Sequence, residues 1–307
     1  MLYSLLPIKI YSVLFASFLF SFLGLKFCMR LLPKDQGREF AVNGALSEGK
    51  PRGAGIVFIT AFVLSSVLFI PLNHEQIINL ALIYAAMMTG YLDDAAEKPW
   101  GELKKGLLDV VISFGIAFNF VWHNSTDIKF FGNVIDIPKV VYILLAMALV
   151  WVSINVTNCS DGVDGLCASV SIVTIVMFYL LGGMKMFSVV MVLTLIAYLW
   201  FNCSPSKLLM GDAGSRAIGV FIAILAMHSN RPLMFIPLAI VLIVDGGLGL
   251  VKLTVRRVLK KKDFMENVRT PIHDHMRKNK GWSDTQVVIR FTIVQAVVGF
   301  VALYMFN

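Results

Sequence analysis

Apolar runs of about twenty residues recur along the whole sequence, and they constrain the fold more than any other feature. A helix needs about 20 apolar residues to cross the hydrocarbon core of a bilayer. Ten candidate spans lie near 8–31, 55–72, 76–92, 105–122, 138–156, 165–181, 185–202, 215–230, 233–254 and 285–305. Only 15% of the 307 residues are charged, against roughly 25% in soluble domains. The sequence therefore predicts an all-α polytopic membrane protein with a single domain over residues 1–307.

The distribution of basic residues predicts the orientation in the membrane. An even number of spans puts both termini on one side, and that side with the even-numbered loops holds 5 of the 27 Lys and Arg residues. The remaining 27 − 5 = 22 lie in the odd-numbered loops or in the parts of the spans that adjoin them. Because cytoplasmic loops are enriched in Lys and Arg, the odd-numbered loops are predicted to be cytoplasmic and both termini outside. The net charge of +8 has the same explanation, so no nucleic-acid partner is expected.

One outer loop, 123–137, contains two short β-like runs. Gly132-Asn133 separates them, which is typical of a tight turn. We expect a small extracytoplasmic β-hairpin with a structural role.

The polar residues that are costly in a membrane gather on the predicted cytoplasmic side. They lie in the odd-numbered loops or at the adjoining helix ends, in the segments 32–54, 93–105, 155–165, 203–215 and 255–284. The sequence therefore predicts one polar site on that face.

Two of these segments contain aspartates suited to a metal ion. Asp93 and Asp94 end the third span, and adjacent carboxylates at a membrane boundary repel each other unless a cation or proton relieves them. Asp212 lies between glycines in a Met-Gly-Asp-Ala-Gly-Ser segment whose Ser215 is an expected N-cap. Oxygen ligands suit Mg²⁺. A solvated helix end with mixed charges is the alternative to a functional aspartate pair.

Other polar groups in these segments suit a phosphorylated ligand. Asn155 and Asn158 share a helical face before two Asp-Gly pairs, which is more than a turn requires. Lys50 and Arg52 precede flexible glycines in the first inner loop, where an ordinary positively charged loop is the alternative. Asp245 lies inside the ninth span beside a predicted bend, and pairing with a neighbouring helix is favoured over a direct catalytic role.

The last inner segment contains Thr-Pro-Ile-His-Asp-His. His273 and His275 are expected to recognise phosphate through imidazole N–H groups, because no cysteine or third histidine is nearby to complete a zinc site. Asp274 between them is expected to face Arg277 and Lys278, since a carboxylate would repel a pyrophosphate.

Five stretches together resemble a known family. KPRGAG, GYLDD, NVTNCSDGVDGL, LLMGDAGS and TPIHDHMRKNKGWSDTQVVIRF match the polyprenyl-phosphate N-acetylhexosamine-1-phosphate transferases in order and spacing. The last stretch is most similar to the branch that transfers phospho-N-acetylmuramoyl-pentapeptide. The resemblance implies a multi-pass transferase of the bacterial cytoplasmic membrane. Its implied reaction is transfer from UDP-MurNAc-pentapeptide to undecaprenyl phosphate with Mg²⁺, giving lipid I and UMP in peptidoglycan synthesis.

The resemblance also implies roles for individual residues. Asp93 matches a base toward the lipid phosphate, Asp94 supports it or the metal, and Asp212 binds the metal. The implied substrate-binding residues are Lys50, Asn155, Asn158, Asp161, Asp164, Gly165, Leu209, His273 and His275. Leu209 stands where the family has a uracil-stacking phenylalanine. Direct transfer and a covalent two-step route both stay open.

Two other functions compete with this interpretation. An N-acetylglucosamine-1-phosphate transferase of the same family is the nearer alternative. A transporter or cation channel is more remote, because transporters usually place ion sites near mid-membrane in repeated halves, whereas these acids lie at one face. Contact with membrane lipid is expected, and a homodimer is left open.

Overall fold

The structure is a computed structural model that describes residues 2–37, 47–130 and 132–306. It has a helix at every predicted position. The straight helices are α1 (Leu2–Cys28, extended by the 3₁₀ turn Met29–Leu31), α2 (Gly55–Phe69), α3 (His74–Asp94), α4 (Glu102–His123), α5 (Lys139–Cys159), α6 (Leu166–Leu180), α7 (Lys185–Asn202), α8 (Gly211–His228) and α13 (Asp284–Phe306). Residues 38–46 of the first predicted inner loop lie outside the described part of the chain.

The ninth predicted span is broken rather than straight. It consists of a 3₁₀ turn (Pro232–Met234), α9 (Phe235–Leu238), α10 (Ile240–Leu242), the π-helical turn η4 (Ile243–Gly247) and α11 (Leu248–Val258). The segments before and after Ala239 differ in direction by 70°. The 70° change of direction therefore lies at Ala239 and not beside Asp245, where the bend was predicted and where the structure has the π-helical turn. The separate short helix α12 (Ile272–Lys280) follows α11.

The protein is embedded in a membrane, as its long apolar helices indicate. Within the described residues, five helices are long and apolar enough to cross a bilayer, or six when the bent pair counts as one span. The helices α2 and α6 are apolar but shorter. Many large apolar side chains on the outer faces of the helices, such as Trp122 and Phe300, are exposed, which suits contact with lipid.

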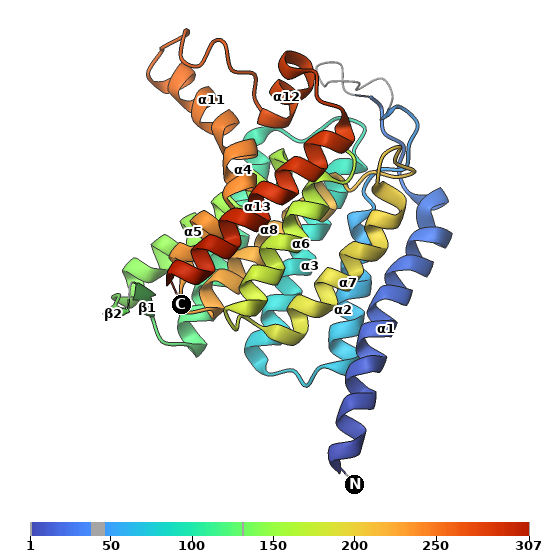
Figure 1. Ribbon diagram of the computed structural model, residues 1–307, viewed down its shortest axis with the longest axis vertical. Coiled ribbons are helices and arrows are strands. Elements are labelled where there is room, and N and C mark those ends of the chain that lie inside the picture. The colour runs from blue at the N-terminus through green and yellow to red at the C-terminus, as the bar shows by residue number, and fades with distance from the viewer. Residues whose placement is uncertain (1, 38–46, 131, 307) are drawn as a thin grey trace.

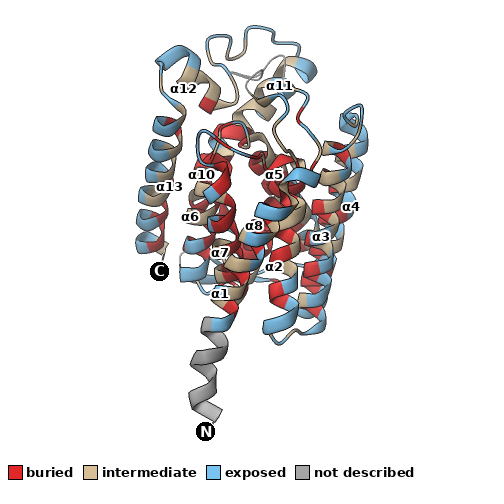
Figure 2. Cartoon of the chain, turned by 90° about the vertical axis from the view of Figure 1, so that its right-hand side faces the viewer, coloured by how far each residue is buried: buried red, intermediate tan, exposed pale blue. Residues whose placement is uncertain are grey.

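Helix α8 lies at the centre of the bundle. Its side chains are buried from Ala213 to Met227, and it packs mainly against α3 and α5. The burial pattern in Figure 2 shows the same buried centre surrounded by helices with exposed outer faces. The helix begins at Gly211, so the expectation that Ser215 caps it was wrong. Ser215 instead lies one turn inside, and its hydroxyl donates to the carbonyl of Gly211 at 3.0 Å.

The predicted hairpin is present as β1 (Asp127–Phe130) and β2 (Asn133–Asp136), paired antiparallel with Asp127 opposite Asp136. Gly132 adopts a positive φ of 78° in the turn. The hairpin and both chain ends lie toward one end of the bundle, and α12 lies at the other (Figure 1).

Candidate active site

Three aspartates from two helices meet near the α12 end of the bundle. Asp93 and Asp94 end α3, and Asp212 lies in the first turn of α8. Two glycines allow this approach. A Cβ on Gly90 would lie 2.3 Å from the Asp212 backbone, and one on Gly211 would lie 2.2 Å from an Asp94 carboxylate oxygen. The Ala213 N–H also donates to Asp94 at 3.1 Å, which ties the end of α3 to the start of α8.

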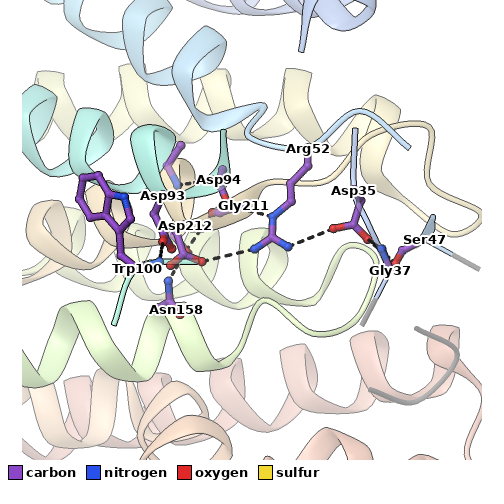
Figure 3. A network of polar contacts seen from close by, with 12 residues as sticks. Asp35, Gly37, Ser47, Arg52, Asp93, Asp94, Trp100, Asn158, Gly211 and Asp212 are labelled. Carbon is purple, nitrogen blue, oxygen red and sulfur yellow. Dashed lines mark hydrogen bonds and ion pairs between the residues drawn. The ribbon is translucent and has the colours of Figure 1, made fainter. Parts of the chain in front are cut away.

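Two cations, Arg52 and Lys105, bridge these carboxylates, and Figure 3 shows Arg52 among them. Arg52 contacts Asp94 at 2.8 Å and Asp212 at 3.7 Å, and its other side pairs with Asp35 at 3.0 Å. Lys105, from the first turn of α4, lies 2.5 Å from Asp93 and 3.2 Å from Asp212. Four ionised aspartates and two cations give this cluster a net charge of 2 − 4 = −2.

The cluster changes the pKa of its members. Burial raises the pKa of Asp94 to about 6, and the nearby charge of Asp212 adds to this rise. Burial alone would raise the pKa of Asp212, but Lys105 and Arg52 outweigh it and lower that pKa. Asp94 and Asp212 therefore repel each other, as two carboxylates do when they share a cation site.

The cluster fits a magnesium ion that a substrate helps to hold. Its donors are carboxylate oxygens, and its net negative charge would be relieved by a divalent cation. No group of three or more His, Cys, Asp or Glu side chains converges on a metal position within the described residues. Mg²⁺ sites in phosphoryl-transfer proteins commonly use one or two carboxylates, with substrate phosphates and waters completing the shell. Asp94 and Asp212 match that arrangement.

A cavity of about 570 Å³ opens beside the aspartate cluster. Arg52 and Gly211 line it and also touch the cluster, so the two are continuous. The predicted residues that line this cavity are Lys50, Asp161, Asp164, Leu209 and His273. Its volume is within the range of ligand sites, about 300–1,000 Å³.

Polar contacts hold one wall of the cavity together. The Lys50 ammonium donates to Ser206 at 3.0 Å and lies 3.8 Å from Asp164. Asp164 in turn accepts from the Ser206 N–H at 3.0 Å. Leu209 is fixed by its backbone, whose N–H donates to the Pro51 carbonyl at 2.8 Å.

Four of the predicted substrate-binding residues lie outside this lining. Asn158 instead hydrogen-bonds Asp212 and lies 3.2 Å from Ser215. Asn155 donates to the carbonyl of Trp151, and its side chain also bonds Asp109. The Gly165 N–H donates to Asn202 at the start of α6. His275 accepts from the Arg269 N–H at 3.3 Å, on the outer side of α12.

His273 is held by a buried carboxylate in the broken ninth helix. Its Nδ1 lies 2.8 Å from Asp245, and its backbone N–H donates to the same side chain at 2.7 Å. Asp245 lies in the π-helical turn η4, a distortion that often marks functional sites. The opposite side of the imidazole packs on Gly162, where a Cβ would lie 2.2 Å from Nε2. The expected pairing of Asp245 with a neighbouring segment is confirmed.

The carboxylate between the two histidines follows its expectation in part, because it contacts Arg277 but also lines the cavity. Asp274 lies 3.5 Å from Arg277, one helical turn away, and 3.8 Å from the Nε2 of His273. Arg277 is fixed from the other side by Asp284 at 2.7 Å. Arg277 and Asp274 both line the cavity, so a carboxylate as well as a cation lies close to any ligand there.

Sequence reasoning missed two contacts that organise the site. The local sequence pattern assigns no role to Lys105 or to Asp35. The sequence places Lys105 near the start of a predicted span, but its contact with α8 depends on how the helices pack. No sequence signal pointed to Asp35, because its partner Arg52 lies seventeen residues away across a loop.

Comparison with known proteins identifies the family. A family model described as Glycosyl transferase family 4 matches residues 76–230. Phospho-N-acetylmuramoyl-pentapeptide-transferase of Treponema pallidum (strain Nichols) is 35% identical over 92% of this chain and 85% of its own length. The chain belongs to the phospho-N-acetylmuramoyl-pentapeptide-transferase family.

Other members of the phospho-N-acetylmuramoyl-pentapeptide-transferase family align over most of the chain. The protein of that name from Clostridium acetobutylicum is 28% identical over 95% of this chain and 97% of its own length. That of Wolinella succinogenes is 28% identical over 86% and 83%. The chain is therefore a transferase, and its family favours the N-acetylmuramoyl branch over the N-acetylglucosamine branch and over a transporter.

Proposed function

We propose that this protein transfers phospho-N-acetylmuramoyl-pentapeptide from UDP-MurNAc-pentapeptide to undecaprenyl phosphate, giving lipid I and UMP for peptidoglycan and cell-wall synthesis. The observation that carries the proposal is the 35% identity with a transferase of that name over 92% of the chain. The aspartate cluster beside a cavity that Lys50, Arg52 and Arg277 help to line supports it, because phosphoryl transfer depends on charge neutralisation and placement more than on covalent chemistry.

Ten spans with both termini outside remain part of this proposal. Helices at all ten predicted positions support it. Five or six of the described helices are also long and apolar enough to cross a bilayer. The hairpin and both chain ends lie away from α12, at the end of the bundle opposite the aspartate cluster. With the basic loops inside, the site would face the cytoplasm, where a soluble UDP carrier reaches it.

The reaction forms one phosphorus–oxygen bond and breaks another. An oxygen of undecaprenyl phosphate attacks the sugar-bearing phosphorus of the donor, and the bond to UMP breaks. Asp93 accepts a proton from the lipid phosphate, while Trp100 N–H at 2.6 Å and Lys105 hold its carboxylate in place. Asp94 and Asp212 would hold Mg²⁺, which when bound supplies neutralisation of the pyrophosphate charge.

The cavity supplies the donor site. Lys50, Arg52 and Arg277 supply cations that suit a pyrophosphate. The same lining also contains five carboxylates, those of Asp35, Asp161, Asp164, Asp274 and Asp284. Leu209 offers an apolar surface to the uracil ring in place of an aromatic one. His273 is within the lining, with Asp245 behind it, and donates to a phosphate or sugar oxygen.

A single assay tests this proposal. Purified protein with undecaprenyl phosphate and Mg²⁺ is offered UDP-MurNAc-pentapeptide or UDP-GlcNAc, and UMP release is followed. We expect release with the first donor and at most a trace with the second. Release with UDP-GlcNAc alone would assign the chain to the other branch, and chelation of Mg²⁺ should stop the reaction reversibly.

A further inference from the structure

A second ion pair lies one helical turn away from the site, between the same two helices that carry Lys105 and Asp212. Asp109 of α4 lies 2.5 Å from Arg216 of α8, and their side chains are only 4% and 6% exposed. Each residue follows its counterpart in the site by four positions, so Lys105–Asp212 and Asp109–Arg216 form two successive rungs between α4 and α8. The two rungs have opposite polarity.

These rungs are the main connection between the two helices. Helix α4 packs extensively on α3 and α5, whereas its backbone makes only slight contact with α8. The position of Lys105 relative to Asp212 is therefore not fixed by close packing of α4 against α8. Long polar side chains bridge the gap instead.

Helix α5 contacts both rungs through asparagines three residues apart. Asn158 bonds Asp212 in the first rung, and Asn155 bonds Asp109 in the second. This gives Asn155 a contact that its sequence motif did not suggest. The three helices thus form a polar ladder whose first rung belongs to the aspartate cluster and whose second rung lies deeper among apolar helices.

The buried Asp109–Arg216 ion pair is not an effective way to stabilise the fold. Taking two charges out of water is costly, and replacing such a pair by apolar side chains is often neutral or stabilising. The Arg216 Nε has no hydrogen-bond partner within the described residues, which adds to that cost. The best-attested use of a buried polar pair is to fix the register of neighbouring helices.

We propose that Asp109 and Arg216 are positioning residues that set the register of α4 against α8 and so hold Lys105 opposite Asp212. This inference rests on the proposed function, because it assigns the pair to the transferase site. Lys105 bridges Asp93 and Asp212, so a shift of α4 would move its ammonium group away from both carboxylates. A misplacement of about 1 Å can cost about a hundredfold in rate.

The test separates position from stability. The double variant Asp109→Leu/Arg216→Met removes both charges and leaves no unpaired ion. We expect its melting temperature in detergent to stay within a few degrees of the unmodified protein. Its kcat for UMP release should nevertheless fall at least about tenfold, with the donor KM changed less than about threefold. A second double variant, Asp109→Asn/Arg216→Gln, provides a shorter neutral pair and should lower kcat in the same way.

A matched control comes from the other end of α8. Glu75, which is buried, and His228, which is partly exposed, contact each other at 3.1 Å. They also join α8 to a neighbouring helix, but at the end of α8 away from the aspartates. Glu75→Gln should lower the melting temperature while keeping kcat within about twofold. If either double variant folds and keeps kcat within about twofold, the pair is structural and the inference is overturned. Failure of the unmodified protein to release UMP would overturn the proposed function instead.

Discussion

Replacing Asp245 by asparagine tests how the broken ninth helix contributes to the site. The carboxylate accepts the His273 backbone N–H at 2.7 Å and contacts Nδ1 at 2.8 and 3.0 Å. Asparagine keeps one acceptor oxygen and nearly the same size, so the backbone contact can persist. The contact with the imidazole becomes a neutral hydrogen bond. We therefore expect a correctly folded protein in which a weaker hydrogen bond positions the His273 imidazole.

The size of the effect follows from the change in that hydrogen bond. A hydrogen bond to a charged group contributes about 1.5–3 kcal/mol, against about 0.5–1.5 kcal/mol for a neutral one. The difference of about 1–2 kcal/mol corresponds to a loss of roughly 5- to 30-fold in kcat/KM if His273 acts in the transition state.

The pH dependence should change in a defined direction. Burial alone would lower the pKa of His273, but the charge and hydrogen bonds of Asp245 outweigh it and raise that pKa. The imidazolium and the stability it contributes are therefore present at low pH and are lost as pH rises through the raised pKa. Without the Asp245 charge that pKa falls. The alkaline limb of the pH–rate profile should move to lower pH.

The assay is kcat/KM for UMP release measured across pH for the unmodified protein and Asp245→Asn. Asp263→Asn, at an exposed aspartate of the loop before α12, is the matched control and should leave the profile unchanged. An Asp245→Asn protein with unchanged kcat/KM and an unchanged alkaline limb would refute the positioning of His273 by Asp245.

Three further substitutions test the proposed roles. Asp212→Ala should abolish turnover while leaving the melting temperature in detergent near normal; substantial activity at saturating Mg²⁺ would remove Asp212 from the metal site. Asp93→Asn should lower kcat at least about a hundredfold with little change in donor affinity, the scale of general-base catalysis. Loss of donor binding with an intact kcat would place Asp93 in the substrate site instead. Asp274→His should stay within a few fold in activity, because Asp274 faces Arg277; loss of transfer would show that this carboxylate contributes to the reaction.

The helices and the aspartates were predictable because their signals are local. A run of apolar residues predicts a helix whatever its neighbours are, and Asp93-Asp94 at a span end is costly by itself. The contacts of Arg52 and Lys105 were not predictable, since each depends on how α2, α4 and α8 pack. The break at Ala239 was also hidden, because the surrounding residues are as apolar as those of a straight span.

The start of α8 shows the limit of local capping signals. Ser215 is a favourable N-cap residue, yet the helix begins four residues earlier. The Asp94 carboxylate accepts the Ala213 N–H and so satisfies that helix start from another chain segment. A tertiary contact replaced the local cap, and it also brought Asp212 into the first turn beside the α3 aspartates.

The central claim is tested most directly by the mass of the lipid product. Purified protein is incubated with UDP-MurNAc-pentapeptide, undecaprenyl phosphate and Mg²⁺, and the extracted lipid is analysed by mass spectrometry. The account predicts undecaprenyl pyrophosphate linked to MurNAc-pentapeptide, formed in equal amount to UMP and absent with Asp212→Ala. Unmodified undecaprenyl phosphate together with consumed donor, or a lipid product that Asp212→Ala forms equally well, would contradict it.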